Sequence, residues 1–349
     1  MPHLLTRFLR KSFRVLTSSL LIVLISLTLL EILFRWGVPP SERFRIDQAT
    51  RTGKSKFRVT LLGDSFSEDF DGTDQRFYLS QGLEFLNLAV FGTGPLDYLN
   101  RLRAKGLRYQ PNLIIVNYFV GNDLTDTLVR DRIPFGERVI RRDSWDELGA
   151  LSSVGSLFLL SVLYEFWFNH TLTRFQKNAK KEFASSPIFS LSHARNPFLV
   201  TAGKQLPDFF QLNLLVDDAR ATKAWSRNEQ ALEEMANLAV KMNSRLWINI
   251  YPATSQVNHS HDAFLKELGF KIPEDLTRTR VPQDLILAFC KRKRLDCFDL
   301  LPEFRTRGEH EFYQEYDDHW NSAGRELALR LVHFKLKAAG ALPSAPASY

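Results

Sequence analysis

Four short segments hold the residue types that could perform nucleophilic chemistry. The sequence GDSF places Ser65 in a turn, GND places Asn122 in another, and Asp317 precedes His319 by two residues near the carboxyl end. An imidazole that takes the proton of a serine hydroxyl makes that oxygen a nucleophile, and a carboxylate at the other ring nitrogen fixes the imidazole tautomer. These residues could therefore form an acyl-transfer site.

The same segments offer donors for a developing negative charge. Asn122 carries a side-chain amide, and Gly92, in the loop sequence NLAVFGTG, can present its backbone N–H to the same point. The glycines of that loop lack the G-x-G-x-x-G spacing, so a dinucleotide site is disfavoured and no cofactor is indicated. Each segment taken singly is also explained as an ordinary turn, because Gly, Asn and Asp are common turn residues. A lone histidine, such as His319, is more often a surface residue than a base.

Three of these segments follow short apolar runs that are typical of strands. The runs are 59–62, 85–90 and 112–118, and the last is apolar on both faces. Continuous apolar strands are characteristic of parallel sheets that helices cover on both sides. Helical spacing at 97–107 separates the second run from the third, as such a sheet requires.

The carboxyl half repeats this alternation. Helical patterns at 222–243 and 282–291 lead into strand patterns at 246–251 and 296–300, and residues 322–339 form a closing amphipathic helix. We therefore expect a three-layer α/β/α sandwich with a mostly parallel sheet. In such a sheet the carboxyl ends of the strands meet at one edge, where the candidate segments can converge.

In their order along the chain, the four segments resemble the blocks of the SGNH, or GDSL, hydrolase superfamily. The resemblance covers residues 57–340 and implies a flavodoxin-like α/β/α fold. It also implies that Ser65 is the nucleophile, that His319 is its general base and that Asp317 orients the imidazole. The oxyanion hole would then consist of the Ser65 and Gly92 backbone N–H groups and the Asn122 side-chain amide.

Two features depart from the commonest pattern of that superfamily. Its acid usually stands three residues before the histidine, where this chain has Tyr316. The D-x-H-W arrangement found here is similar instead to membrane-anchored members and to the polysaccharide O-acetyltransferase branch, so Asp317 is the expected acid and Asp318 the alternative. An insertion at about 130–215 has no counterpart in the pattern.

The amino terminus predicts a membrane anchor. Residues 15–30 carry no charge, and at 1.5 Å per residue the apolar run 15–34 covers about 30 Å, the hydrocarbon thickness of a bilayer. No A-x-A cleavage pattern follows it, so we expect an uncleaved single span. Because four basic residues between 7 and 14 precede the run, the positive-inside rule leaves the amino terminus in the cytoplasm and places the remaining chain in the periplasm or outside the cell. A buried amphipathic helix of a soluble protein is the alternative.

These features define the expected organisation of the chain. The insertion contains an apolar segment, 156–170, which is too short to cross a membrane and could be a buried helix, a cap over the site or a membrane-surface contact. The expected parts are a basic tail and transmembrane anchor at 1–36, a linker at 37–56, a hydrolase-like domain at 57–340 and a flexible tail at 341–349.

The residues, the resemblance and the anchor together predict a membrane-anchored serine esterase. It would hydrolyse a small acyl ester, such as an acetyl ester on a cell-envelope glycan, through an acyl-serine intermediate. An O-acyltransferase on an envelope polysaccharide would use the same triad, with a sugar hydroxyl in place of water. A non-catalytic envelope protein that binds a glycan or another partner is the alternative from a different class. The oligomeric state stays open.

Composition excludes several other classes of protein. The 349 residues are 44% hydrophobic and 24% charged with only two cysteines, which fits neither a disulfide scaffold nor a disordered tail. The formal net charge is +7, and residues 1–35 alone carry +4 of it, so the remainder is too small to indicate a nucleic-acid partner.

Three further patterns have structural explanations. NHSHD at 258–262 lacks a third ligand that could be placed, so we expect no metal site there. KRKR at 291–294 closes a helix, where cations suit the helix dipole, so we expect a solvated helix end, with a polyanion site as the alternative. Cys290 and Cys297 lie on a helix end and the following strand; such elements usually diverge beyond disulfide reach, so we expect two separate buried thiols, although an oxidising compartment would permit a bridge.

Overall fold

The computed structural model describes most of the chain after residue 56. The predicted insertion with its segment 156–170 and the NHSHD segment lie largely outside the described residues, whereas residues 17–19, 21–23 and 25–29 of the predicted anchor are described and are helical. The described residues are 17–19, 21–23, 25–29, 57–68, 72–90, 92–128, 133–135, 138–140, 199, 202–203, 206–257, 261–307 and 311–343. Within these ranges, no helix combines the length and the apolarity that a bilayer crossing needs.

A five-stranded sheet forms the centre of the domain. Its strands are β1 (Arg58–Leu62), β2 (Glu84–Asn87), β3 (Leu113–Phe119), β6 (Arg245–Tyr251) and β7 (Asp296–Asp299). The spatial order is β2-β1-β3-β6-β7, and every neighbouring pair is parallel. This is the flavodoxin-like strand order, so the predicted mostly parallel sheet and α/β class are confirmed.

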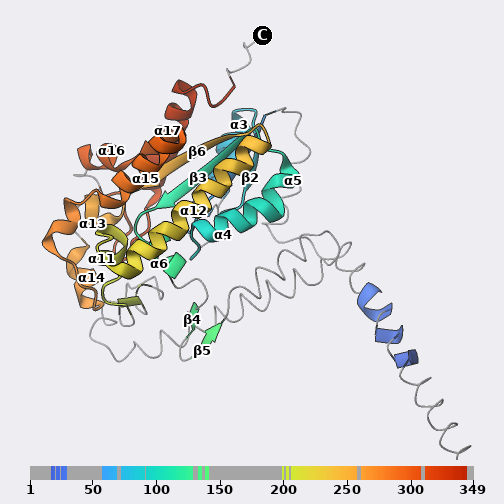
Figure 1. The fold of residues 1–349 in the computed structure, drawn as a ribbon, viewed down its shortest axis with the longest axis horizontal. Helices are drawn as coiled ribbons and strands as arrows, with labels where there is room; N and C mark the ends of the chain where they lie inside the picture. Colours follow the sequence, from blue (N-terminus) through green and yellow to red (C-terminus); the bar gives the residue numbers. More distant parts are fainter. Residues whose placement is uncertain are drawn as a thin grey trace, which may run out of the picture.

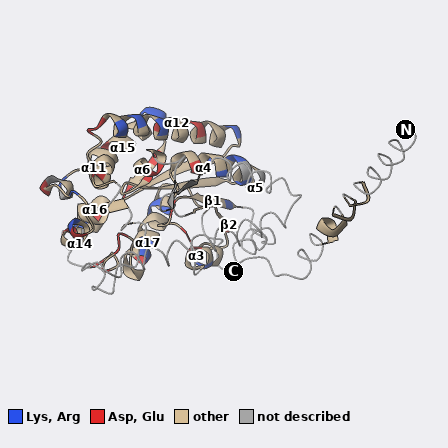
Figure 2. Ribbon diagram, turned by 90° about the horizontal axis from the view of Figure 1, so that it is seen from below, with Lys and Arg blue, Asp and Glu red and all other residues tan. Residues whose placement is uncertain are grey.

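Helices cover both faces of the sheet. Figure 2 shows α4, α12 and α15 in one layer and α3 and α17 in the other, with the strands between them. The main helices are α3 (Thr73–Ser80), α4 (Pro95–Arg101), α12 (Ala219–Lys241), α15 (Val281–Lys293) and α17 (Ser322–Ala338). The three-layer arrangement follows from the right-handed crossovers that parallel strands require.

Shorter elements complete the described chain (Figure 1). They are the π-helical turn η1 (Leu102–Gly106), α5 (Leu107–Tyr109), α6 (Asp123–Leu128), the antiparallel pair β4 (Ile133–Phe135) and β5 (Arg138–Ile140), α11 (Phe209–Leu214), α13 (Thr254–Val257), α14 (Asp262–Glu267), the 3-10 turn η3 (Glu274–Thr277) and α16 (Leu301–Thr306).

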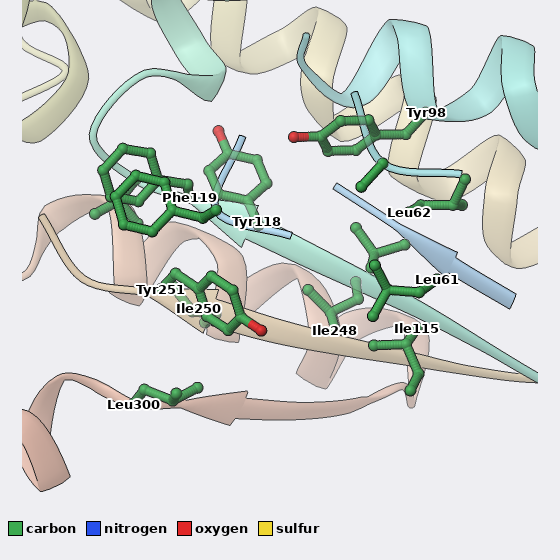
Figure 3. Close-up of a cluster of buried hydrophobic side chains, with 14 of the residues drawn as sticks. Leu61, Leu62, Tyr98, Ile115, Tyr118, Phe119, Ile248, Ile250, Tyr251 and Leu300 are labelled. Carbon is green, nitrogen blue, oxygen red and sulfur yellow. The ribbon is translucent and has the colours of Figure 1, made fainter. Parts of the chain in front are cut away.

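The core lies on both sides of the central strands. All seven residues of β3 are buried, as the continuous apolar run predicts. Ile115 of β3 is fully buried on one face of the sheet, and Ile248 and Ile250 of β6 are fully buried on the other (Figure 3). Tyr98 packs from α4 onto the other side of β1, next to Leu62 (Figure 3). A sheet buried on both faces cannot slip in register without exposing these side chains, so the loops at its carboxyl edge have fixed origins.

Two of the predicted boundaries differ from the structure for a clear physical reason. The strand expected at 85–90 ends at Asn87, because the Asn87 side chain accepts a hydrogen bond from the Ala89 N–H at 2.8 Å and donates one to the Ser67 carbonyl at 2.8 Å. These bonds turn the chain toward the loop after β1. The helix expected at 97–107 begins earlier, at Pro95, whose fixed backbone angle suits a first helical turn.

The predicted separation of the two cysteines is wrong. Cys290 and Cys297 form a disulfide, with their Cα atoms 6.3 Å apart. The helix α15 ends at Lys293, and Arg294 then adopts a left-handed conformation that reverses the chain within two residues. Because the reversal is so tight, the last turn of the helix stays within disulfide reach of β7.

Candidate active site

A compact turn after β1 presents Ser65. The Asp64 carboxylate accepts a hydrogen bond from the Phe66 N–H at 3.0 Å, and the Asp64 carbonyl accepts one from the Ser67 N–H at 3.1 Å. A Cβ atom on Gly63 would lie 2.5 Å from the Ser67 hydroxyl oxygen, so the tightness of the turn requires glycine there. The turn keeps Asp64 buried and leaves Ser65 partly exposed at the carboxyl edge of the sheet.

A chain of hydrogen-bonded, buried polar side chains from β3 and β6 supports this turn. Asn117 of β3 donates its side-chain amide to the Ser67 hydroxyl at 2.9 Å, and Asn249 of β6 donates to the Asn117 side-chain oxygen at 2.8 Å. Trp247 donates its indole N–H to Asn249 at 2.7 Å. Since buried polar groups are costly without partners, this satisfied chain fixes the turn against two central strands.

His319 lies directly opposite Ser65. Its Nε2 atom is 2.7 Å from the Ser65 hydroxyl oxygen, although 254 positions separate the two residues in sequence. Its Nδ1 atom is 2.8 Å from an Asp317 carboxylate oxygen. The structure thus brings the predicted nucleophile, base and acid into one chain of hydrogen bonds, with the geometry that proton transfer from the hydroxyl requires.

The loop before α17 holds the acid and the imidazole. The Gln314 N–H donates to the His319 carbonyl at 2.8 Å, and the Asp317 N–H donates to the Gln314 carbonyl at 3.2 Å, closing a short hairpin-like turn. Tyr316 takes the strained left-handed conformation, with φ of 60°, that this turn needs. The Asp317 carboxylate also accepts hydrogen bonds from the backbone N–H groups of Asp318 and His319, which fixes its orientation.

A second carboxylate flanks the imidazole. An Asp318 carboxylate oxygen lies 3.3 Å from His319 Nδ1, against 2.8 Å for Asp317, and both acids are buried. The shorter contact makes Asp317 the principal partner of the imidazole, and Asp318 stands close enough to add its charge. The sequence raised these two acids as alternatives, and the structure places both beside the same nitrogen.

The Phe66 ring packs against one side of the imidazole, a contact that the sequence analysis did not predict. Phe66 stacks on His319 with ring centroids 5.0 Å apart and on Phe119 with centroids 3.7 Å apart. Trp320 meets the edge of Phe66 with centroids 5.2 Å apart. The aromatic residue after Ser65 was the available indication, because the turn that exposes the serine directs the next side chain toward the base.

Burial and charge shift the ionisation of this cluster. Burial lowers the pKa of His319, but the hydrogen bond to Asp317 and the negative charges of Asp318, Asp317 and Asp64 outweigh it and raise that pKa to about 9. Burial raises the pKa of Asp318 to about 7, against the opposing charge of His319. Burial also raises the pKa of Asp64 to about 6. The site therefore favours an imidazolium, the form that the base must reach during acyl transfer.

The predicted oxyanion donors lie on the two loops beside this turn. The loop after β2 runs along the loop after β1, since the Val90 N–H donates to the Gly63 carbonyl at 3.1 Å. Gly92 sits in that loop with φ of 59°, a conformation that favours glycine. Asn122 lies in the loop after β3, where its backbone carbonyl accepts hydrogen bonds from the Asp126 N–H at 2.8 Å and the Thr125 hydroxyl at 2.9 Å. Its side-chain amide nitrogen offers two hydrogens to an acceptor.

A buried tyrosine joins the two donor loops. The Tyr98 hydroxyl lies 3.1 Å from the Thr93 carbonyl oxygen and 2.6 Å from an Asp123 carboxylate oxygen. One hydroxyl proton cannot serve both acceptors, whereas a protonated Asp123 can donate to Tyr98 while Tyr98 donates to Thr93. Burial raises the pKa of Asp123 well above its usual range, which agrees with the protonated form. Sequence reasoning named neither Tyr98 nor Asp123 as part of the site.

The capacity of the site for metal is limited by its own hydrogen bonds. Asp317, Asp318 and His319 each offer a ligand atom, all within 4.8 Å of one another. Both nitrogens of the His319 ring are already engaged, one by Asp317 and the other by Ser65. A metal ion would have to replace one of those bonds, so the arrangement suits proton transfer better than metal ligation.

Comparison with known proteins gives only distant structural likeness. No protein-family model matches the chain, and no curated protein sequence matches it. A GDSL-like lipase from Bacteroides thetaiotaomicron shares 11% identity at a TM-score of 0.40, covering 85% of this chain and 98% of that one. A lipase/acylhydrolase from Enterococcus faecalis shares 12% sequence identity at a TM-score of 0.38, covering 81% of this chain and 96% of that one. A variant of an acetylxylan esterase from Geobacillus stearothermophilus shares 9% sequence identity at a TM-score of 0.40, covering 81% of this chain and 94% of that one. Likeness at this level assigns no family.

Proposed function

We propose that the protein is a serine ester hydrolase of the SGNH type, with Ser65 as its nucleophile. The observation that carries the proposal is the continuous hydrogen-bonded chain from the Ser65 hydroxyl through His319 to Asp317, with distances of 2.7 and 2.8 Å. A binding module has no need for an imidazole between a hydroxyl and a buried carboxylate. Such a chain prepares a hydroxyl for attack on a carbonyl carbon.

The reaction follows from these positions in two steps. The Ser65 oxygen attacks the ester carbonyl carbon while its proton passes to His319 Nε2, and the carbonyl oxygen takes up a negative charge. The Ser65 N–H, the Gly92 N–H and the side-chain amide of Asn122 would stabilise that oxyanion. The C–O bond to the alcohol then breaks, the alcohol leaves with the proton from Nε2, and an acyl ester of Ser65 remains.

The second step returns the enzyme to its starting state. A water molecule gives a proton to His319 Nε2 and attacks the acyl carbon, and the bond to Ser65 breaks as the serine oxygen regains the proton. Throughout both steps Asp317 and Asp318 stabilise the imidazolium. A sugar hydroxyl in place of water would give acyl transfer with the same residues, so hydrolysis and transfer differ only in the acceptor.

We extend the proposal to substrate and location on the basis of sequence. The D-x-H-W arrangement supports a small acyl group, such as acetyl, carried by an envelope glycan. The uncharged run within residues 15–34 and the basic residues before it support a single membrane anchor with the domain outside the cytoplasm. Compartment and family analogy support these finer statements, whereas the geometry supports the ester chemistry.

The proposed function is tested with p-nitrophenyl acetate and the purified full-length chain. Ser65→Ala should lower kcat by several orders of magnitude, up to roughly 10⁶-fold, and His319→Ala should be comparable, with little further loss in the double variant. Ser80→Ala, which alters an exposed serine at the end of α3, is the matched control and should keep full activity. Equal release of nitrophenol by the Ser65→Ala variant and the unaltered protein would leave the non-catalytic binding protein as the better description.

A further inference from the structure

The edge of the sheet opposite Ser65 collects the ends of the main helices. In this parallel fold each helix runs against the strands, so its last turn lies at the amino ends of the strands. The helices α3, α12 and α15 end within four residues of β2, β6 and β7, respectively. The end of α17 lies there too, because Arg245 at the start of β6 donates a hydrogen bond to the Ala339 carbonyl at 2.9 Å. We call this surface the amino edge.

Three helices carry an exposed apolar side chain near their ends at the amino edge. Val240 near the end of α12 is 77% exposed, Phe334 in the last third of α17 is 65% exposed, and Leu79 at the end of α3 is 44% exposed. Within the described part of residues 57–343, Val281 is the one other large hydrophobic side chain in this exposed class. Single exposed apolar residues are ordinary, but here each lies near the end of a helix that reaches the amino edge, α12 in one layer and α3 and α17 in the other (Figure 2). Both layers therefore offer apolar contact at this edge.

The amino edge also carries a surplus of positive charge. Several of its cations are neutralised across the surface, as in the pairs of Arg245 with Asp296 and of Arg292 with Glu229. Four further cations are exposed and form no ion pair with another described residue: Lys241, Lys291, Arg294 and Lys337. Figure 2 shows basic residues at the end of α12 that lies near α5. The helix dipole explains cations at helix ends, but it does not explain the apolar side chains beside them.

The chain connects this edge to the proposed anchor. Phe57 directly precedes β1, whose first residue lies at the amino edge, so the segment from the anchor enters the domain here. Ser65 follows the other end of the same strand. Contact between the amino edge and a bilayer would therefore leave the site facing away from the membrane, open to a substrate in the aqueous phase.

We propose that the amino edge is a docking surface for anionic lipid headgroups. Basic residues interspersed with exposed apolar side chains are the combination that holds a protein at an anionic membrane surface: the cations attract the headgroups and the apolar groups enter the boundary region. The four exposed cations supply the attraction, and Val240, Phe334 and Leu79 supply the apolar contact. The inference concerns a different surface from the proposed ester site.

Hydrogen exchange of the full-length chain tests the proposal. The protein is compared in vesicles of phosphatidylcholine alone and in vesicles containing about one third phosphatidylglycerol. Amides in the last turns of α12, α15 and α17 should exchange about threefold more slowly, or slower still, with the anionic vesicles, and high salt should remove the difference because it screens exposed charges. The readout does not use ester hydrolysis, so p-nitrophenyl acetate turnover in the same samples reports separately on the proposed function.

Charge reversal supplies the matched comparison. The edge variant carries four substitutions, Lys241→Glu, Lys291→Glu, Arg294→Glu and Lys337→Glu. It should lose the protection by anionic vesicles. The control variant reverses four exposed cations on the opposite side and should keep it: Lys223→Glu, Lys266→Glu, Lys271→Glu and Arg278→Glu. Equal exchange with the two kinds of vesicle, or undiminished protection in the edge variant, would overturn the proposal. Protection by soluble heparin but not by anionic vesicles would also overturn it, in favour of a soluble polyanion.

Discussion

Replacing Asp317 by Asn probes how the acids act on His319. The rise in the pKa of His319 from its ordinary value of 6.5 to about 9 corresponds to at most about 3 kcal/mol in favour of the imidazolium. The base becomes an imidazolium as it takes the Ser65 proton, so the same interaction stabilises the transition state. Asp318 and Asp64 contribute to the same rise, so Asp317→Asn should lose only part of this energy. The expected reduction in rate is at most about 10²-fold, in addition to any effect of the wrong tautomer.

The same substitution frees the base at neutral pH. With a pKa of about 9, only about 1% of His319 is deprotonated at pH 7. Removing the charge of Asp317 lowers that pKa, so a larger fraction of the base is free at pH 7 in Asp317→Asn. The electrostatic part of the loss should therefore be largest above pH 9, at most about 10²-fold, and shrink to within about tenfold at pH 7.

The assay is kcat/KM for p-nitrophenyl acetate between about pH 6 and pH 10, with Ser65→Ala subtracted as the background. In the unaltered protein, the fall in kcat/KM on the acid side of the profile (the acid limb) should begin well above pH 6.5, and Asp317→Asn should shift this acid limb to lower pH. Because Asp318 remains 3.3 Å from the same nitrogen, only the double variant Asp317→Asn, Asp318→Asn should remove most of the upward shift, and burial of the imidazole should then place the limb below pH 6.5. Glu315→Gln, an exposed acid on the same loop, should leave the profile unchanged. An acid limb that stays in place after Asp317→Asn would refute the reasoning.

Three further perturbations test the structure around the site. Tyr98→Phe removes the hydroxyl between the donor loops and should cost about 1–3 kcal/mol in the free energy of unfolding, measured by urea denaturation. Asp123→Asn preserves a neutral, hydrogen-bonding group and should cost less than about 1 kcal/mol at pH 7 in the same measurement, whereas a larger loss would mean that the carboxylate is ionised. Reduction of the Cys290–Cys297 disulfide should destabilise the domain by at most about 2.5 kcal/mol, the loop-closure value for so short a loop, seen as a lower urea midpoint with dithiothreitol. An unchanged midpoint on reduction would show that the bridge does not constrain the unfolded chain.

The sequence determined the strands, the main helices and the segments that carry chemistry. Apolar runs long enough to be buried on both faces predict parallel strands, and β1, β3, β6 and β7 lie within two residues of the predicted positions. The positions of Ser65 and Asn122 followed from the same pattern, because each comes directly after such a run. These properties depend on local periodicity and on turn residues, which can be recognised in the sequence without knowing which segments contact one another.

Contacts between residues that are far apart in the sequence could be established only from the tertiary structure. Nothing local places His319 at 2.7 Å from Ser65, since 254 positions separate them and the sheet must first bring the two loops to one edge. The stacking of Phe66 on His319 and the bridge of Tyr98 between the donor loops arise in the same way. The disulfide shows that nearness in sequence is also insufficient for predicting a contact. Cys290 and Cys297 are only seven positions apart, yet whether they bond depends on how sharply the chain reverses at Arg294, whose backbone is left-handed.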